Sequence, residues 1–299
     1  MHRVRLAVGL ALIALAAAAC SGEGSGHDAG KVSVVATTGV WGSVASAVAA
    51  THASVKSVET GANADPHSFE PTPADVAEIA DAALVVYNGG GYDHWVDDVL
   101  AGDPAINAVD AYSLRGTKER SNEHVFYDLG IAKAVAWEIA NRLAKIDTAH
   151  ADEYRSNAAE FGRQADDIAA SERAIGTAHP SASVVATEPV AYYLLRTAGI
   201  TDRTPPGFAT AVEEGDDPAP ADVAAMLDLI SSHQVSALLF NPQTESPATK
   251  QIEDAARRAS LPVVTVTETL PQGADYLTWQ RDTVKELAGQ FDNAPRTTR

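Results

Sequence analysis

Residues 183–199 read Ser-Val-Val-Ala-Thr-Glu-Pro-Val-Ala-Tyr-Tyr-Leu-Leu-Arg-Thr-Ala-Gly, and they set the pattern of the fold. The first five residues are β-type and lack strict polar alternation, as expected for a parallel strand that is covered on both faces. Pro189 then suits the first turn of a helix, and Gly199 suits its end. A strand followed by a helix predicts a right-handed crossover within a doubly wound α/β sheet.

Similar apolar runs recur along the chain at Val32–Ala36, Leu84–Asn88, Ala237–Asn241 and Val263–Thr267. Between them we predict the helices Val76–Ala82, Val190–Ala198 and Ala221–Ser232. The acidic, proline-bearing stretch Ala209–Pro220 is interpreted as a surface loop. These repeated units predict an α/β protein with two doubly wound lobes and mainly parallel sheets.

The middle of the chain is different, because it contains no proline from Asp128 to Ile175. Asp128 is a suitable N-cap, and apolar residues then recur every three to four positions, which indicates a helix packed on the first lobe. A second long helix follows. We therefore expect an N-terminal lobe over residues 31–148, a rigid linker helix over 149–176 and a C-terminal lobe over 177–299.

Residues 1–20 have the features of a secretory signal, and their apolar run is too short to span a bilayer. Arg3 and Arg5 precede the apolar run Leu6–Ala19, which ends at Cys20. This ending resembles a bacterial lipobox and predicts that Cys20 is lipidated, with an ordinary A-x-A cleavage site as the alternative. Residues 21–30 are rich in glycine and predict a flexible tether. Because Cys20 is the only cysteine, an internal disulfide and a thiolate metal site are both excluded.

The charge balance bears on the class of partner. The chain has 22 basic and 40 acidic residues, a net charge of −18. Such a surface disfavours binding to nucleic acid and to anionic lipid, and it weakly favours the approach of cations. We therefore expect no nucleic-acid partner.

One loop is unusually restrained, and it reads Asp65-Pro66-His67-Ser68-Phe69-Glu70-Pro71. Pro66 and Pro71 restrict the backbone on both sides of His67. Thr72 is suited to cap the helix that follows. A histidine held in this way points in a defined direction before anything binds, which suits a metal ligand.

Two acidic residues follow apolar strands, at the place where open α/β sheets bind ligands. They are Glu188 and Glu268 of the second lobe. His67 and His124 are the candidates from loops of the first lobe. Two neutral imidazoles and two carboxylates carry a charge of −2, which a divalent cation would neutralise in a buried site.

The chain resembles the cluster A-I (ZnuA/TroA-type) metal-binding lipoproteins of ABC importers for zinc and manganese. The matching stretches cover nearly the whole chain beyond the tether, and they are Ala64–Glu70, Val86–Gly89 with Trp95, His124–Asp128, Glu188, and Glu268 with Tyr276 and Trp279. The resemblance implies that a divalent metal ion binds in the cleft between the lobes. The ligands it implies are His67, His124, Glu188 and Glu268.

The resemblance also implies a carrier and not an enzyme. Such a protein captures Zn²⁺ or Mn²⁺ as its transported ligand and delivers it to an ABC permease that works with an ATPase subunit. It would be a monomer, attached through lipidated Cys20 to the outer face of the cytoplasmic membrane, in a periplasm or at a cell surface.

Three residues depart from the family pattern. Phe126 stands where tryptophan is usual, Leu129 where proline is usual, and Glu268 where aspartate is common. The first two affect packing and helix capping. The third lengthens a ligand by one methylene group and leaves the details of coordination open.

Two further residues are secondary candidates. Glu245 also follows a strand and is the alternative to Glu268 as the fourth ligand, or else a residue that supports the site from outside. Asp128, with Tyr127, is a candidate to orient His124, because a ligating imidazole needs an acceptor on its other nitrogen.

More than one metal and more than one type of function are compatible with the sequence. Two bidentate glutamates and two imidazoles give six donors and suit Mn²⁺, whereas Zn²⁺ would take the same residues tetrahedrally. Residues 115–123, where zinc-type relatives often carry histidines, contain none. The alternative function is an exported metal-dependent hydrolase, but the chain lacks an H-E-x-x-H motif and a P-loop. A third possibility is a binder of organic solutes.

Overall fold

The computed structural model describes residues 30–61, 66–116 and 122–293. The predicted signal, the lipidation of Cys20 and nearly all of the predicted tether lie outside these residues. Within them, no helix has the length and apolar character that crossing a membrane requires.

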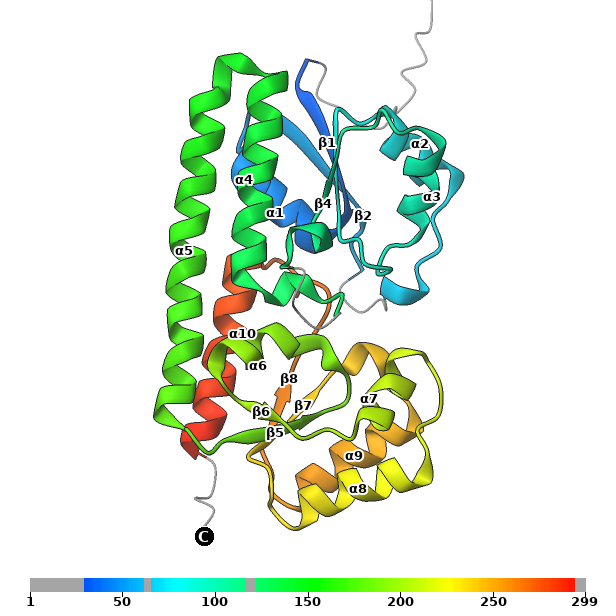
Figure 1. The fold of residues 1–299 in the computed structure, drawn as a ribbon, viewed down its shortest axis with the longest axis vertical. Coiled ribbons are helices and arrows are strands. Elements are labelled where there is room, and N and C mark those ends of the chain that lie inside the picture. The colour runs from blue at the N-terminus through cyan, green and yellow to red at the C-terminus, as the bar shows by residue number, and fades with distance from the viewer. Residues whose placement is uncertain (1–29, 62–65, 117–121, 294–299) are drawn as a thin grey trace, which may run out of the picture.

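Two four-stranded sheets form the centres of the two lobes (Figure 1), and every strand pair in them is parallel. The first sheet has the order β2 (Ala53–Glu59), β1 (Val32–Thr38), β3 (Leu84–Tyr87), β4 (Ala108–Asp110). The second repeats this order as β6 (Thr201–Asp202), β5 (Ser183–Ala186), β7 (Ala237–Phe240), β8 (Val263–Thr265). The predicted fold class, two doubly wound parallel lobes, is therefore confirmed.

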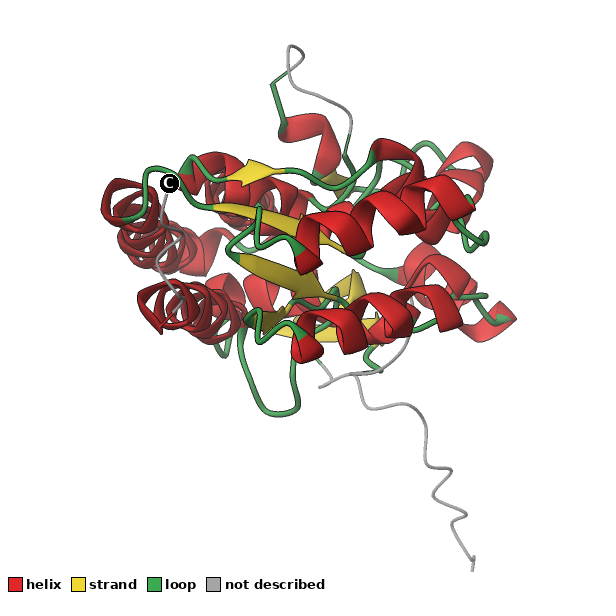
Figure 2. Cartoon of the chain, turned by 90° about the horizontal axis from the view of Figure 1, so that it is seen from below, coloured by secondary structure: helices red, strands yellow, loops and turns green. Residues whose placement is uncertain are grey.

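Helices cover the faces of both sheets (Figures 1 and 2). In the first lobe they are α1 (Gly39–Ala49), α2 (Pro73–Asp81), α3 (Trp95–Gly102) and α4 (Leu129–Ile146). In the second they are α6 (Tyr192–Ala198), α7 (Pro206–Glu213), α8 (Pro220–Ser231), α9 (Pro247–Arg258) and α10 (Tyr276–Asn293). The long helix α5 (Ala151–Ala178) connects the two lobes. Its 28 residues span about 42 Å at 1.5 Å per residue.

The five predicted strands are present as β1, β3, β5, β7 and β8. The prediction of a loop over Ala209–Pro220 is wrong for its first part, because α7 continues to Glu213. Pro206 occupies the first turn of this helix, and Phe208 and Val212 are one turn apart and buried in the second lobe. The spacing of these two apolar residues was the signal for a helix.

The largest hydrophobic core is continuous through both lobes, because α5 and α10 contribute to each of them. The C-terminal helix α10 returns to the first lobe, where the Trp279 ring meets that of Tyr127 at 5.2 Å between centroids. The Tyr276 hydroxyl donates to the Phe126 carbonyl at 2.7 Å. In Figure 1, α4, α5 and α10 run along one side of the molecule and hold the lobes together.

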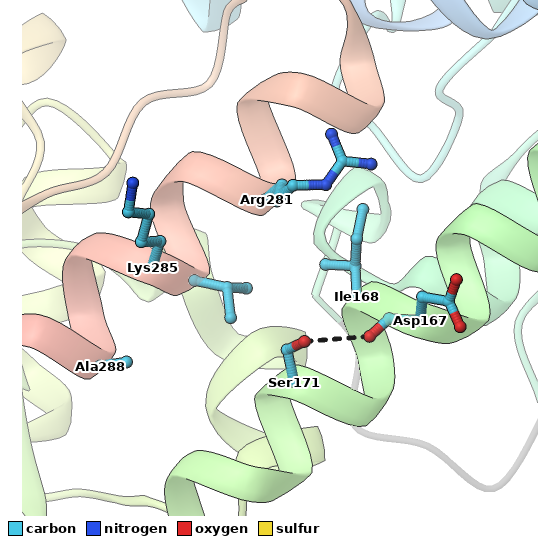
Figure 3. A pocket seen from close by; sticks show the side chains of 7 residues that line it. Asp167, Ile168, Ser171, Arg281, Lys285 and Ala288 are labelled. Carbon is cyan, nitrogen blue, oxygen red and sulfur yellow. Dashed lines mark hydrogen bonds between the residues drawn. The ribbon is translucent and has the colours of Figure 1, made fainter.

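The groove between α5 and α10 is separate from the candidate site residues (Figure 3). It encloses about 300 Å³ and is lined by Ile168, Val284 and Ala288 with polar side chains at its rim. Ser171 at this rim donates to the Asp167 carbonyl of its own helix at 3.0 Å. The lining residues include one carboxylate, Asp167, beside the basic Arg281 and Lys285, and no histidine.

Glu172 of α5 is buried near the junction of the lobes, and its Oε1 has no hydrogen-bond partner. Burial, with a smaller contribution from Asp128, raises the pKa of Glu172 to about 8. The stabilisation linked to its proton is complete below the unfolded pKa of about 4.3 and is lost as the pH rises through the folded value. We expect the free energy of unfolding of Glu172→Gln to fall less between pH 6 and 9 than that of the wild type.

Urea unfolding at several pH values measures this difference, which we expect to be on the order of 1 kcal/mol per pH unit. Asp167→Asn changes an exposed carboxylate on the same helix and should follow the wild type. Identical pH profiles for the wild type and Glu172→Gln would contradict a protonated Glu172.

Candidate metal centre

His67 lies in a single 3-10 turn, η1 (Pro66–Ser68), shortly before α2. Thr72 and Asp75 form a reciprocal capping box that fixes the start of α2. The side chain of His67 keeps 25% of its surface exposed. The predicted cap at Thr72 is therefore present, and it anchors the loop that carries His67.

His124 is almost completely buried, with 1% of its surface exposed, and it directly precedes the 3-10 turn η3 (Val125–Tyr127). Its backbone N–H donates to Asn122 Oδ1 at 3.0 Å. Asn88, at the end of β3, donates to the carbonyl of Glu123 at 2.8 Å and accepts from the indole of Trp41. Buried amides therefore hold the loop of His124 against the first sheet.

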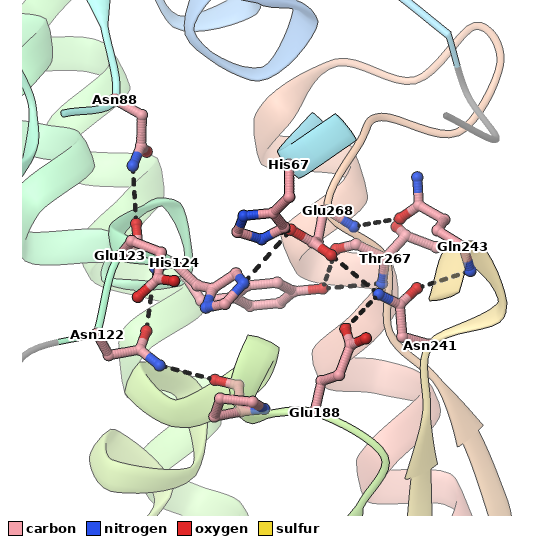
Figure 4. A network of polar contacts seen from close by, with 12 residues as sticks. His67, Asn88, Asn122, Glu123, His124, Glu188, Asn241, Gln243, Thr267 and Glu268 are labelled. Atoms are coloured by element: carbon pink, nitrogen blue, oxygen red, sulfur yellow. Dashed lines mark hydrogen bonds and ion pairs between the residues drawn. The ribbon is translucent and has the colours of Figure 1, made fainter. Parts of the chain in front are cut away.

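Glu188 and Glu268 follow β5 and β8 and are buried at the carboxyl ends of these strands. Asn241, which directly follows β7, lies between them (Figure 4). Its Nδ2 donates to Glu188 Oε2 at 2.9 Å and to Glu268 Oε1 at 3.0 Å. One amide group therefore holds both carboxylates of the second lobe.

Glu268 brings the two lobes together at one point. Its Oε2 lies 3.2 Å from His67 Nε2 and 3.3 Å from His124 Nε2. The three residues offer donor atoms that all lie within 4.8 Å of one another. Glu188 stands outside this group of three and is linked to it through Asn241.

The charges of these residues are strongly coupled. Burial by itself would raise the pKa of Glu268, but the adjacent imidazoles of His124 and His67 outweigh it and hold that pKa well below its usual range. Burial would lower the pKa of His124, but Glu268 raises it overall. Burial, followed by the charge of Glu268, raises the pKa of Glu188. Glu268 therefore remains a carboxylate beside two imidazoles.

Two buried polar atoms of the candidate ligands have neither a hydrogen-bond nor an ion-pair partner. They are Nδ1 of His124 and Oε1 of Glu188, whereas Nε2 of His124 and Oε2 of Glu268 meet in an ion-pair contact of 3.3 Å. Leaving such groups unpaired away from water costs roughly 1–3 kcal/mol each. A cation held by imidazole nitrogens and carboxylate oxygens would satisfy them, so this donor set fits a divalent metal ion.

The secondary candidates have other contacts. Glu245 is exposed, directly before Ser246, which caps α9. Asp128 caps α4 by accepting from the backbone of Gly130 and Ile131, and its other oxygen pairs with Arg196 at 2.6 Å.

Tyr127 connects the lobes, and its hydroxyl makes no hydrogen bond to the imidazole of His124. Its only bond to that residue is from its backbone N–H to the His124 carbonyl at 3.0 Å. Its hydroxyl donates to the carbonyl of Thr267 at 2.9 Å. The ring of Tyr92 packs on His67 with 4.9 Å between centroids, and burial and Glu268 raise the pKa of its hydroxyl well above the usual value.

Asn241 was missed by the sequence reasoning, although it occupies the same kind of position as Glu188. The position directly after a parallel strand identified Glu188 and Glu268 as candidates, whereas Asn241 was assigned to the end of its own strand. Tyr92 was missed because an aromatic residue in a glycine-rich loop carries no distinctive pattern.

Comparisons with known proteins give one matching family model and several similar relatives. The family model of the periplasmic zinc-uptake complex component A, ZnuA, matches residues 34–290. The metal ABC transporter substrate-binding lipoprotein ScbA of Streptococcus cristatus is 29% identical over 52% of this chain and 56% of its own length, so the match spans about half of that relative. The manganese ABC transporter substrate-binding lipoprotein PsaA of Streptococcus anginosus is 22% identical over 81% of this chain and 82% of its own.

Solved structures share the fold. The laminin-binding protein Lmb of Streptococcus agalactiae has a TM-score of 0.75 at 23% identity, covering 87% of this chain and 99% of its own. A crystal structure of ZnuA has a TM-score of 0.71 at 19% identity, covering 88% and 99%. The two-lobed architecture is therefore that of known metal-binding and transport proteins.

The role of Asn241 can be tested in the metal-free protein. Asn241→Ala removes the donor shared by two buried carboxylates, so we expect the free energy of unfolding at pH 7 to fall by about 1–3 kcal/mol. Asn157→Ala is the control, because it removes a single amide hydrogen bond to the Val48 carbonyl and should cost about 1 kcal/mol or less. A loss at Asn241 no larger than at Asn157 would show that the amide does not hold the pair.

Proposed function

Because this chain belongs to the family of the zinc-uptake complex component A, we propose that it captures a divalent transition metal ion, Zn²⁺ or Mn²⁺, and delivers it to an ABC importer. The observation that carries the proposal is the position of Glu268 Oε2 between the Nε2 atoms of His67 and His124. The family consists of transport substrate-binding proteins and not of enzymes.

The proposed ligands are His67, His124, Glu188 and Glu268. The unpaired buried donor atoms of His124 and Glu188 and the combined charge of −2 of the four residues support this assignment, because one divalent ion would satisfy both. Glu188 would reach the ion with its free Oε1 while Asn241 continues to hold Oε2. Four protein ligands would leave little room for a catalytic water, which argues against the hydrolase alternative.

Both Zn²⁺ and Mn²⁺ fit this donor set. Carboxylates that bind through one oxygen each would give a tetrahedral zinc site, and bidentate carboxylates would give a six-coordinate manganese site. Relatives carry names for either metal, and one from Streptococcus pyogenes is named for iron. Oxygen and nitrogen sites hold zinc more tightly than manganese, so availability would decide which ion is carried.

Release of the ion would require local loop movement, because the lobes are firmly tied. Helix α5, the Tyr127–Thr267 hydrogen bond and the Arg196–Asp128 ion pair all connect them. In this proposal the permease binds both lobes and favours a state in which Glu188 or Glu268 has left the ion.

The remaining parts of the proposal concern location. Relatives named as lipoproteins of ABC transporters support anchoring at the outer face of the cytoplasmic membrane. In this chain Cys20 would carry the lipid, and the permease and its ATPase subunit would be the partners of a monomer.

The role of His67 is tested by metal-dependent thermal stabilisation. At a metal concentration of 100 times Kd, binding stabilises the wild type by about 2.7 kcal/mol. A 100-fold weaker site in His67→Ala would keep only about 0.4 kcal/mol, so we expect the shift in Tm to nearly disappear. His94→Ala is the control, because His94 is an exposed histidine of the same lobe. An unchanged shift in His67→Ala would remove this residue from the site.

The carboxylate ligands are tested by three isosteric variants. We expect Glu188→Gln and Glu268→Gln each to weaken Zn²⁺ binding by more than about 100-fold, because they remove a ligand and not merely an outer contact, which typically costs 10–100-fold. Glu245→Gln should bind within about twofold of the wild type, since Glu245 is exposed. Competition titration with a zinc-binding dye measures all three. The reverse order, with Glu245→Gln the weakest, would replace Glu268 by Glu245 as a ligand.

A further inference from the structure

A second cluster of donor atoms lies beside the proposed ligands. Glu123, His124 and Glu213 offer donor atoms that all lie within 4.8 Å of one another. Glu123 belongs to the loop before η3 in the first lobe, and Glu213 is the last residue of α7 in the second. Two carboxylates from different lobes therefore meet at His124.

The two carboxylates lack a basic partner in the part of the chain that the structure describes. No lysine or arginine of the described ranges forms an ion pair with either of them. Both residues are half-buried, so solvent screens their mutual repulsion only in part. A bound cation would remove this repulsion and link the lobes.

His124 gives an independent indication that a ligand belongs here. Its ring is buried, its Nε2 faces Glu268 Oε2 at 3.3 Å, and its Nδ1 has no hydrogen-bond partner. Figure 4 shows Glu123 and Glu268 on opposite sides of this ring. The same imidazole therefore belongs to two donor clusters, one with Glu268 and His67 and the other with Glu123 and Glu213.

The residues of the two clusters differ in their exposure to solvent. Glu268, His124 and Glu188 are almost inaccessible to solvent. Glu123 and Glu213 are half-buried, so they reach solvent on one side and His124 on the other. An ion that arrives from water would therefore meet the half-buried carboxylates, or the half-buried His67, before it meets Glu268.

We propose that Glu123 and Glu213 form an outer cation site, which holds an incoming divalent metal ion beside His124 before it moves to the buried ligands. This inference rests on the proposed function. Carboxylate oxygens bind a partly hydrated divalent ion weakly and exchange it easily, which suits a site of passage. The outer site speeds loading of the inner one.

Stopped-flow measurement of Zn²⁺ association tests the proposal on the full chain. We expect Glu123→Gln/Glu213→Gln to bind Zn²⁺ at least about fivefold more slowly than the wild type, with each single variant in between. Glu214→Gln is the matched control, because it removes the same charge from the exposed neighbouring residue. It should stay within about twofold of the wild type. Equal rates for the double variant and Glu214→Gln would overturn the proposal and leave the pair as a contact that shares a proton.

A second measurement is made with the inner site weakened. In a His67→Ala background, electron paramagnetic resonance should detect weak residual Mn²⁺ binding, and the added substitutions Glu123→Gln and Glu213→Gln should abolish it. Unchanged residual binding would overturn the outer site. A wild-type chain that binds neither metal would overturn the proposed function itself, whereas wild-type binding with unaltered kinetics in the variants would overturn only this inference.

Discussion

The structure of the site depends on the convergence of Glu188 and Glu268 on the single amide of Asn241. Two buried carboxylates repel each other and lose their hydration, so they can lie this close only if donors or cations compensate them. Asn241 satisfies one oxygen of each. The imidazoles of His67 and His124 face the free oxygen of Glu268 and stabilise its charge. The arrangement brings donors of both lobes to one point and leaves a few buried atoms without partners.

The scaffold tolerates this arrangement because the lobes are joined by more than a hinge. Helix α5 runs along both lobes, and α10 returns from the second sheet to pack its aromatic residues on η3 of the first lobe. The hydrophobic core is continuous through this contact. Repulsion among the carboxylates therefore acts against a large buried interface and not against a flexible connection. Domains joined by small, polar interfaces are expected to move relative to each other. The interface between these lobes is continuous with the hydrophobic core and is therefore not of that kind.

The sequence predicted the parts of the fold that depend on local pattern. Long apolar runs revealed five strands, and proline-free periodicity revealed α4 and α5. Three strands were not predicted: β6 has only two residues, β4 has three and ends in Asp110, and β2 has seven but mixes Ser54, Lys56 and Ser57 with its apolar residues. Within the candidate site, His67 and Glu188 were marked by restrained loops and strand ends, because local chemistry determines both. Asn241 was not recognised as the group that holds the carboxylates, since its role depends on two partners 53 and 27 residues away. The return of α10 to the first lobe is likewise a tertiary contact with no local signal.

The segment that carries Glu268 belongs to the second lobe in the sequence but is hydrogen-bonded to the first lobe. Glu268 follows β8 and belongs to the second lobe by sequence, but Tyr127 of the first lobe donates to the carbonyl of Thr267 and accepts from its N–H. Helix α10, which begins eight residues after Glu268, is fastened to the first lobe through the hydrogen bonds of Tyr276 to Ser43 and Phe126. Glu268 thus follows the second sheet, and its backbone N–H donates to Gln243 of the second lobe, while the preceding Thr267 is bonded to the first lobe. A change in the angle between the lobes would strain this segment, so loop rearrangement around Glu188 and Glu268 costs less than rigid-body opening.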